Sequence, residues 1–187
     1  ENLIADIDEA AYNRIMENRT VSEDEAKKTA EIVGLAALKY GDLSNQATKD
    51  YVFDIDRFTS FEGNTGPYIL YTIARINSIL KKYQDTCENT ENGEILPPSA
   101  EPEKTLMLAL SRYSDVMLIC FEALAPHKIC AYIYELSNAL NHFYHETKII
   151  AEEDRKKQAG YISLVTLTRD VLMTCINVLG FSAPERM

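Results

Sequence analysis

Residues 61–83 read FEGNTGPYILYTIARINSILKKY, and this stretch carries the clearest helix signal in the chain. Its first part is typical of a turn, and Pro67 suits the first turn of a helix, where a missing N–H group costs nothing. Helical spacing then places five aliphatic side chains on one side: Ile69, Leu70, Ile73, Ile76 and Leu80. The stretch therefore predicts an amphipathic helix that packs in a larger helical domain.

The opposite side of this helix combines aromatic and basic residues, namely Tyr68, Tyr71, Arg75 and Lys82. Aromatic rings beside cations suit unstacked nucleobases, because the rings offer faces for stacking and the cations contact phosphate. Tyrosines on a bundle helix also commonly pack against a neighbouring helix while the hydroxyl group reaches water. The pattern by itself fits both interpretations.

The rest of the chain predicts an all-α fold, an antiparallel helical bundle. A first helix is expected over about 3–18, and its apolar side would carry Leu3, Ile7, Ala11 and Ile15. A second helix should begin at a capping box formed by Ser22 and Glu25 and continue to Tyr40. A loop with a short helix should occupy 42–61, and an exposed linker 85–104. Further helices are expected over 103–113, 115–125, about 126–150 and 161–179, with 152–160 as a charged connection, Gly180 as a cap and Phe181 as an anchor.

Composition is that of a globular protein, with 46% hydrophobic and 26% charged residues among 187. No uninterrupted apolar run approaches the roughly 18 residues of a membrane span, and no signal-type N-terminus appears, so we expect a cytoplasmic protein with no membrane partner. DNA is not expected as a partner either. The net charge of −10 argues against a general nucleic-acid binder. A locally basic strip would still allow one structured RNA to bind; its candidates are Arg75, Lys81, Lys82, Lys148, Arg155, Lys156, Lys157 and Arg169.

No catalytic or metal-binding constellation is apparent, and no cofactor is expected in this segment. Cys87, Cys120, Cys130 and Cys175 lack C-x-x-C spacing, which favours reduced and mostly buried thiols. His142 and His145 could share a helical face with Glu146, but structural zinc almost always takes four protein ligands. Asp54 and Asp56 would point to different faces of a helix, so solvation or a salt bridge to Arg57 is expected.

Four stretches, in order along the chain, resemble arginyl-tRNA synthetases. They are VGLAALKYGDLSNQATKDYVFDIDRFTSF, SFEGNTGPYILYTIARINSIL, YIYELSNALNHFYHETKII and the C-terminal GFSAPERM. The resemblance implies a C-terminal anticodon-binding helical bundle of the class I synthetase type over residues 61–187. It also implies that residues 1–60 form a helical junction to a catalytic domain missing from this segment.

The resemblance nominates site residues, all for RNA binding. Tyr68 and Tyr71 match family tyrosines that contact anticodon-loop bases, and Arg75 matches the basic residue on the same face. Tyr144 and His145 lie in the family's F-Y-H segment, and Met187 matches a terminal methionine that packs against the loop. The chain departs from the family pattern at Leu70 and His142.

The function implied is tRNA(Arg) anticodon-loop binding within an arginine–tRNA ligase. The parent enzyme would use ATP and Mg, but the ATP-binding signatures lie upstream, so this segment should not activate arginine. The acidic balance leaves an alternative open, a helical protein–protein interaction module that binds a partner through the Tyr68 face and binds no RNA.

Overall fold

The computed structural model describes residues 2–17, 22–86 and 93–184, and within these ranges every regular element is an α-helix. The first pair is α1 (Asn2–Glu17) and α2 (Glu23–Leu43), followed by the single turn α3 (Ile55–Phe58). The remaining helices are α4 (Gly66–Thr86), α5 (Glu101–Ser111), α6 (Tyr113–Ala123), α7 (His127–Glu146) and α8 (Arg155–Val178). This confirms the predicted all-α class.

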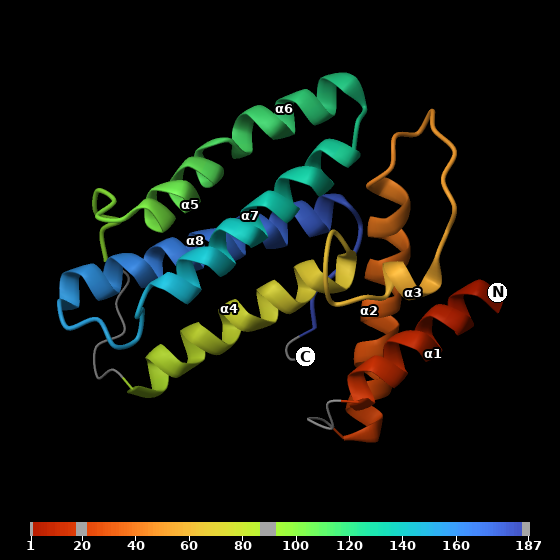
Figure 1. Cartoon of the computed structure of the whole chain (residues 1–187), viewed down its shortest axis with the longest axis horizontal. Coiled ribbons are helices and arrows are strands. Elements are labelled where there is room, and N and C mark those ends of the chain that lie inside the picture. Colours follow the sequence, from red (N-terminus) through yellow and green to blue (C-terminus); the bar gives the residue numbers. More distant parts are fainter. Residues whose placement is uncertain (1, 18–21, 87–92, 185–187) are drawn as a thin grey trace.

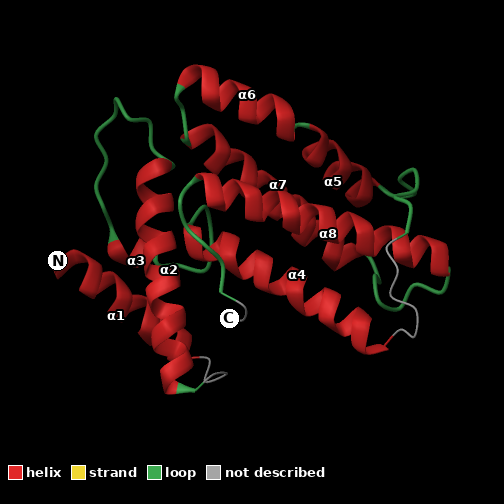
Figure 2. Ribbon diagram, turned by 180° about the vertical axis from the view of Figure 1, so that it is seen from behind, coloured by secondary structure: helices red, strands yellow, loops and turns green. Residues whose placement is uncertain are grey.

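The helices from α4 to α8 form a bundle in which α4 runs in one direction, α5 and α6 together run back, α7 runs in the direction of α4, and α8 runs back again (Figure 1). α7 and α8 lie in the middle, α5 and α6 cover one side, and α4 covers the other (Figures 1 and 2). α1 and α2 pack on each other, and α2 crosses the end of the bundle against α4. The C-terminal ends of α4 and α7 therefore lie at the same end of the bundle as the start of α8.

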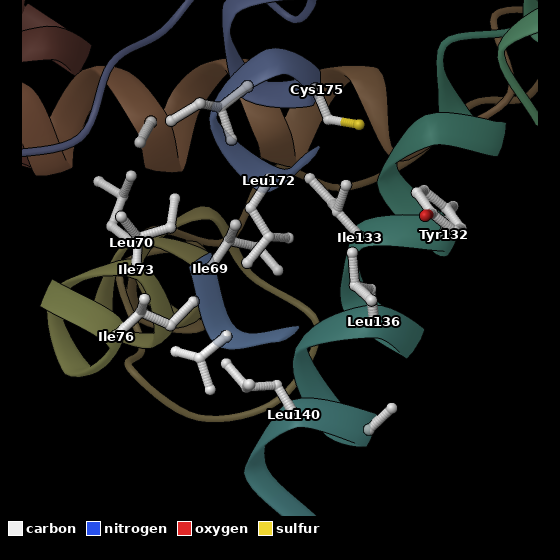
Figure 3. Packing of buried hydrophobic residues seen from close by; sticks show 14 of the residues in the cluster. Ile69, Leu70, Ile73, Ile76, Tyr132, Ile133, Leu136, Leu140, Leu172 and Cys175 are labelled. Atoms are coloured by element: carbon white, nitrogen blue, oxygen red, sulfur yellow. The ribbon is translucent and has the colours of Figure 1, made fainter. Parts of the chain in front are cut away.

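The core is built from the aliphatic stripes that the sequence predicts. Figure 3 shows side chains of α4, α7 and α8 meeting, with Ile69, Ile73 and Leu136 among those fully or almost fully buried. The apolar stripe that helical spacing predicts for residues 126–150 is buried, namely Ile129, Ile133, Leu136, Leu140 and Phe143. The predicted stripe of the last helix is buried as well, namely Ile162, Val165, Leu172, Ile176 and Leu179. Leu70 belongs to the same core, as its wheel position predicts. Tight burial of aliphatic surface is the main source of stability here.

α4 begins where the turn signal predicts. Thr65 caps its first turn: its hydroxyl accepts a hydrogen bond from the Tyr68 N–H group at 3.2 Å and donates one to the Ser60 carbonyl at 2.6 Å. Gly66 sits where α4 meets α2, because a Cβ atom there would lie 2.3 Å from the Ala36 carbonyl oxygen. The cap and the glycine together fix the direction in which α4 leaves the junction.

Helix ends are also largely as predicted. The Ser22 side chain accepts from the Glu25 N–H group at the start of α2. Gly180 has a φ of +82° just after α8, a conformation that glycine adopts at little cost. Phe181 is buried and anchors the chain beyond it.

Several expectations were wrong in detail. The connection expected over 152–160 is mostly helix: α8 begins at Arg155, capped by Asp154, because the charged residues of its first turns point outward while Gln158 and Gly160 are buried. The break between α5 and α6 falls at Arg112, ahead of Ser114 and Asp115.

Smaller corrections concern single side chains. Leu3, near the start of α1, is exposed and does not belong to the core. Asp54 and Asp56 are both exposed to solvent, which confirms one of the two predicted alternatives. The salt bridge to Arg57 is not seen among the described residues: Asp54 caps α3 by accepting from the Arg57 N–H group, and Asp56 lies 3.7 Å from Arg14. Gly93 is not a freely exposed linker residue, because its carbonyl accepts from Ser163 on α8 at 2.6 Å.

α8 is the one described helix with the length and composition of a membrane span, although Arg169 and Asp170 interrupt its apolar run. In the fold, 56% of its apolar window is buried against the other helices. A central core helix passes the same composition test, and the packing of α8 between α4, α5 and α7 accounts for its apolar character.

Candidate nucleic-acid interface

The candidate residues come from two helices that run side by side, α4 and α7. Tyr68, Tyr71 and Arg75 occupy successive turns on the outer side of α4, and Tyr144 and His145 lie near the end of α7. Tyr71 is 41% exposed and Tyr144 39% exposed, while Tyr68 and Arg75 are half-buried. The structure thus brings these residues together on one partly open surface.

Arg75 is the centre of this surface. Its guanidinium carbon lies 5.0 Å from the centroid of the Tyr71 ring and 5.6 Å from that of the Tyr144 ring. A guanidinium at these distances is attracted by the electron-rich ring faces. One Nη atom also donates to Asn141 Oδ1 at 2.7 Å, so the cation is held from three directions. Rings from two helices are thereby linked through a single positive charge.

Tyr68 is more closely packed than the other two tyrosines. Its ring meets Tyr134 edge to face at a centroid distance of 5.7 Å, and its hydroxyl donates to Asn138 Oδ1 at 2.6 Å and accepts from Asn141 Nδ2 at 2.8 Å. Packing against a neighbouring helix, one of the two interpretations of the sequence pattern, therefore holds for this residue. Tyr71 keeps more of its ring open to solvent.

The end of α7 extends the surface. The Tyr144 and His145 rings lie 5.7 Å apart in an edge-to-face arrangement, and both side chains are exposed. His142 is exposed as well. Among residues 2–17, 22–86 and 93–184, no group of three or more His, Cys, Asp or Glu side chains could hold a metal ion. Met187 lies outside the described residues.

The candidate cations differ in their surroundings. Lys81 and Lys82 are exposed near the end of α4, and Lys148, Arg155 and Lys156 are exposed where α7 ends and α8 begins. These helix ends share one end of the bundle (Figure 2). Lys157 lies 3.7 Å from Glu152 and Arg169 lies 3.0 Å from Asp170, so these two have carboxylate partners. A hydrogen bond to Tyr161 is the main cause of the raised pKa of Lys157.

Two residues of this surface were missed in the sequence, Asn138 and Asn141. They carry the hydrogen bonds that join α4 to α7. Their spacing relative to Tyr134 and Tyr144 follows one side of a helix, the same kind of aromatic and polar stripe that α4 shows. α7 therefore carries this aromatic and polar stripe in addition to the aliphatic stripe that faces the core.

The family model described as DALR anticodon binding domain matches residues 69–187. The chain belongs to the DALR anticodon-binding domain family. A second family model, described as tRNA synthetases class I (R), catalytic domain, matches residues 1–55. The matched DALR region contains Tyr71, Arg75, Asn138, Asn141 and Tyr144, and begins one residue after Tyr68.

Relatives of this DALR-domain chain confirm the predicted resemblance. It is 54% identical over 195 residues to an arginine–tRNA ligase of Agathobacter rectalis, covering 100% of this chain and 33% of that protein. The identity to an arginine–tRNA ligase of Alkaliphilus oremlandii is 51% over 188 residues, covering 100% of this chain and 32% of that protein. The chain thus spans about a third of the length of these curated relatives.

Solved structures agree with the fold. Arginyl-tRNA synthetase from Thermus thermophilus superposes with a TM-score of 0.88 at 25% identity, covering 100% of this chain and 32% of that one. Arginyl-tRNA synthetase from Plasmodium falciparum superposes with a TM-score of 0.84 at 26% identity, covering 100% of this chain and 33% of that one. The division into residues 1–60 and 61–187 stays a prediction, and α2 shares one hydrophobic core with the bundle helices.

Proposed function

We propose that this chain binds the anticodon loop of tRNA(Arg), as the C-terminal part of a cytoplasmic arginine–tRNA ligase. The observation that carries the proposal is the partly exposed group of Tyr71, Arg75 and Tyr144 within the DALR-matched region. Two rings offer faces for splayed loop bases, and stacking on such a ring contributes about 1–3 kcal/mol per base.

Charge supports the same surface. The exposed cations at the end of α4 and the start of α8 lie at one end of the bundle, beyond Arg75 along α4. Screening confines charge effects to about 10 Å, so these cations act on a bound phosphate although the whole chain carries a net charge of −10. Met187 lies outside the described residues; the proposal gives it an apolar contact with the loop.

The experiment is a filter-binding titration with tRNA(Arg) over a salt series, beside a tRNA with an unrelated anticodon loop. The wild-type chain should bind tRNA(Arg) more tightly than the unrelated tRNA. The logarithm of its affinity should fall linearly with the logarithm of the salt concentration. Tyr71→Ala and Arg75→Gln should each weaken binding by about tenfold. Arg112→Gln is the matched control, since Arg112 is an exposed, paired arginine at the α5–α6 junction on the other side of the bundle.

Equal affinity for both tRNAs would overturn specific recognition. Unchanged RNA affinity in Tyr71→Ala and Arg75→Gln, together with loss of a protein partner, would favour the protein-interaction alternative.

The ligase activity belongs, in this proposal, to the whole parent enzyme. ATP and Mg would be bound by the catalytic part that precedes this segment, and the chain alone should not activate arginine. ATP–pyrophosphate exchange tests this: the 187-residue chain should give none with arginine, and exchange above background would contradict the assignment.

A further inference from the structure

Four polar side chains form a continuous line of hydrogen bonds between α4 and α7. Arg75 Nη1 donates to Asn141 Oδ1 at 2.7 Å, and Asn141 Nδ2 donates to the Tyr68 hydroxyl at 2.8 Å. The Tyr68 hydroxyl in turn donates to Asn138 Oδ1 at 2.6 Å. The two middle groups, Asn141 and Tyr68, each accept from the group before them and donate to the group after them.

Arg75 sets the direction of the whole line, because a guanidinium has donors and no acceptor. The Asn141 amide must therefore turn its oxygen toward Arg75, which leaves its amino group for Tyr68. The Tyr68 oxygen is then an acceptor, so its hydrogen points to the oxygen of Asn138. Hydrogen bonds arranged in series strengthen one another, and this series starts at a full positive charge.

The orientation of the Asn138 amide follows from this direction. Its oxygen is held against Tyr68, so its amino group points away from that contact. Asn138 is an exposed residue, and within residues 2–17, 22–86 and 93–184 no group accepts a hydrogen bond from its amino group. The surface thus presents a donor of fixed orientation beside the Tyr68 ring.

We propose that Asn138 reads a hydrogen-bond acceptor on the edge of one anticodon-loop base, with Asn141 as the residue that positions it. The inference rests on the proposed function. An amide amino group pairs with a carbonyl oxygen or an unprotonated ring nitrogen of a base, and is left unpaired by a base that presents an amino group there. Stacking on the nearby rings tolerates any base, so the oriented amide supplies the selectivity.

The first test compares wild type with Asn138→Ala on tRNA(Arg) transcripts that each carry one changed anticodon-loop base. Affinity for the unchanged transcript should fall about three- to tenfold in the variant, the effect of losing one hydrogen bond. In wild type, changing a loop base lowers the affinity by some factor, which we call the base penalty. In Asn138→Ala the base penalty at one particular loop position should shrink by the same three- to tenfold, while the base penalties at the other positions stay as in wild type. Asn13→Ala is the matched control, because Asn13 is an exposed asparagine on α1.

The second test uses Asn141→Asp. Aspartate can still accept from Arg75, but it cannot donate to Tyr68, whose hydrogen would then turn toward the new carboxylate. Asn138 would lose its fixed orientation, so the penalty at the same loop base should shrink. Adding Asn138→Ala in this background should not reduce that base penalty further, because the two residues act through one contact.

Each remaining result counts against the inference. A uniform loss of affinity across all transcripts in Asn138→Ala would assign Asn138 to backbone contact, and an unchanged set of base penalties would remove it from recognition. In both cases tRNA(Arg) preference by the wild-type chain would leave the proposed function intact. Equal binding of tRNA(Arg) and an unrelated tRNA by wild type would overturn both.

Discussion

At the scale of single residues, Tyr40 joins three segments through one hydroxyl group. It is fully buried, and its oxygen lies 2.6 Å from Asn64 Oδ1 in the turn before α4 and 2.8 Å from the Cys130 carbonyl on α7. Burial raises its pKa far above the ordinary value, so the group stays a neutral donor.

Tyr40→Phe should therefore lower the free energy of unfolding by about 1–2 kcal/mol, because a buried acceptor loses its donor. Urea unfolding monitored by circular dichroism measures the change. Tyr113→Phe is the control: no hydrogen bond joins the Tyr113 hydroxyl to the described part of the chain, and the expected change is within about 0.5 kcal/mol. Equal changes in the free energy of unfolding in the two variants would show that the buried Tyr40 hydrogen bond does not stabilise the fold.

The buried cysteines predict a specific pH dependence. Burial raises the pKa of Cys130 and of Cys175 from the ordinary 9.0 to about 12. An unfolded chain loses these protons at lower pH than the folded chain, so the stability linked to them is complete below about pH 9 and is lost between pH 9 and 12. The urea concentration at the midpoint of unfolding should fall as the pH rises from 9 to 12. In Cys175→Ala this fall should be less steep than in wild type.

Thiol labelling gives an independent readout of the same shift. Near pH 8, iodoacetamide should modify the half-buried Cys120 at least about tenfold faster than Cys130 or Cys175, since the thiolate is the reacting form. In urea the three rates should converge. Equal rates in the folded chain would contradict the raised pKa values.

Individual residues show how far sequence reasoning reaches. The position of Leu70 in the core and the outward position of Tyr71 follow from helical spacing alone. The contacts of Arg75 with Tyr144 and Asn141 do not, because those partners lie 66 or more positions away in the chain. Spacing predicts which side of a helix a residue occupies, and only tertiary packing determines what it meets there.

At the scale of helices, the crossing of α4 over α2 depends on Gly66. A Cβ atom at this position would lie 2.3 Å from the Ala36 carbonyl oxygen and 2.6 Å from the Ala36 carbonyl carbon, and backbone atoms cannot move aside as a flexible side chain can. Gly66→Ala should cost about 3 kcal/mol or more of unfolding free energy, measured by urea denaturation.

Gly63→Ala is the informative comparison. Gly63 has a φ of +79° with no atom within 4 Å of an added Cβ, so only backbone strain of about 1–2 kcal/mol is expected there. A larger loss in Gly63→Ala than in Gly66→Ala would contradict the close approach of the two helices.

Helix boundaries were predictable where local chemistry marks them. Thr65 and Pro67 mark the start of α4, and Gly180 marks the end of α8. The start of α8 was missed because its first turns are charged, which resembles a solvated loop in sequence. Asp154 was the available signal: it is a typical N-cap residue, and its side chain accepts from the N–H groups of Lys156 and Lys157.

At the scale of the whole molecule, the residues that follow α8 lie against α2, far from α8 in the sequence. The Lys39 ammonium on α2 donates to the Gly180 carbonyl, and the Phe181 side chain is buried in the common core. The residues after α8 therefore run past the junction between α2 and α4 (Figure 1). This places the described residues after α8, up to residue 184, on the side of the bundle that carries α4, where the proposed RNA contacts begin.

Phe181→Ala tests this arrangement. Loss of a buried aromatic side chain should lower the unfolding free energy by about 3 kcal/mol, and release of the segment that leads to Met187 should also weaken tRNA(Arg) binding. Urea denaturation gives the first value, and filter binding at a temperature where both proteins are folded gives the second. Ser182→Ala, at the exposed neighbouring position, should change neither. A stability loss with unchanged tRNA affinity would restrict RNA recognition to α4 and α7 and exclude the C-terminal segment from it.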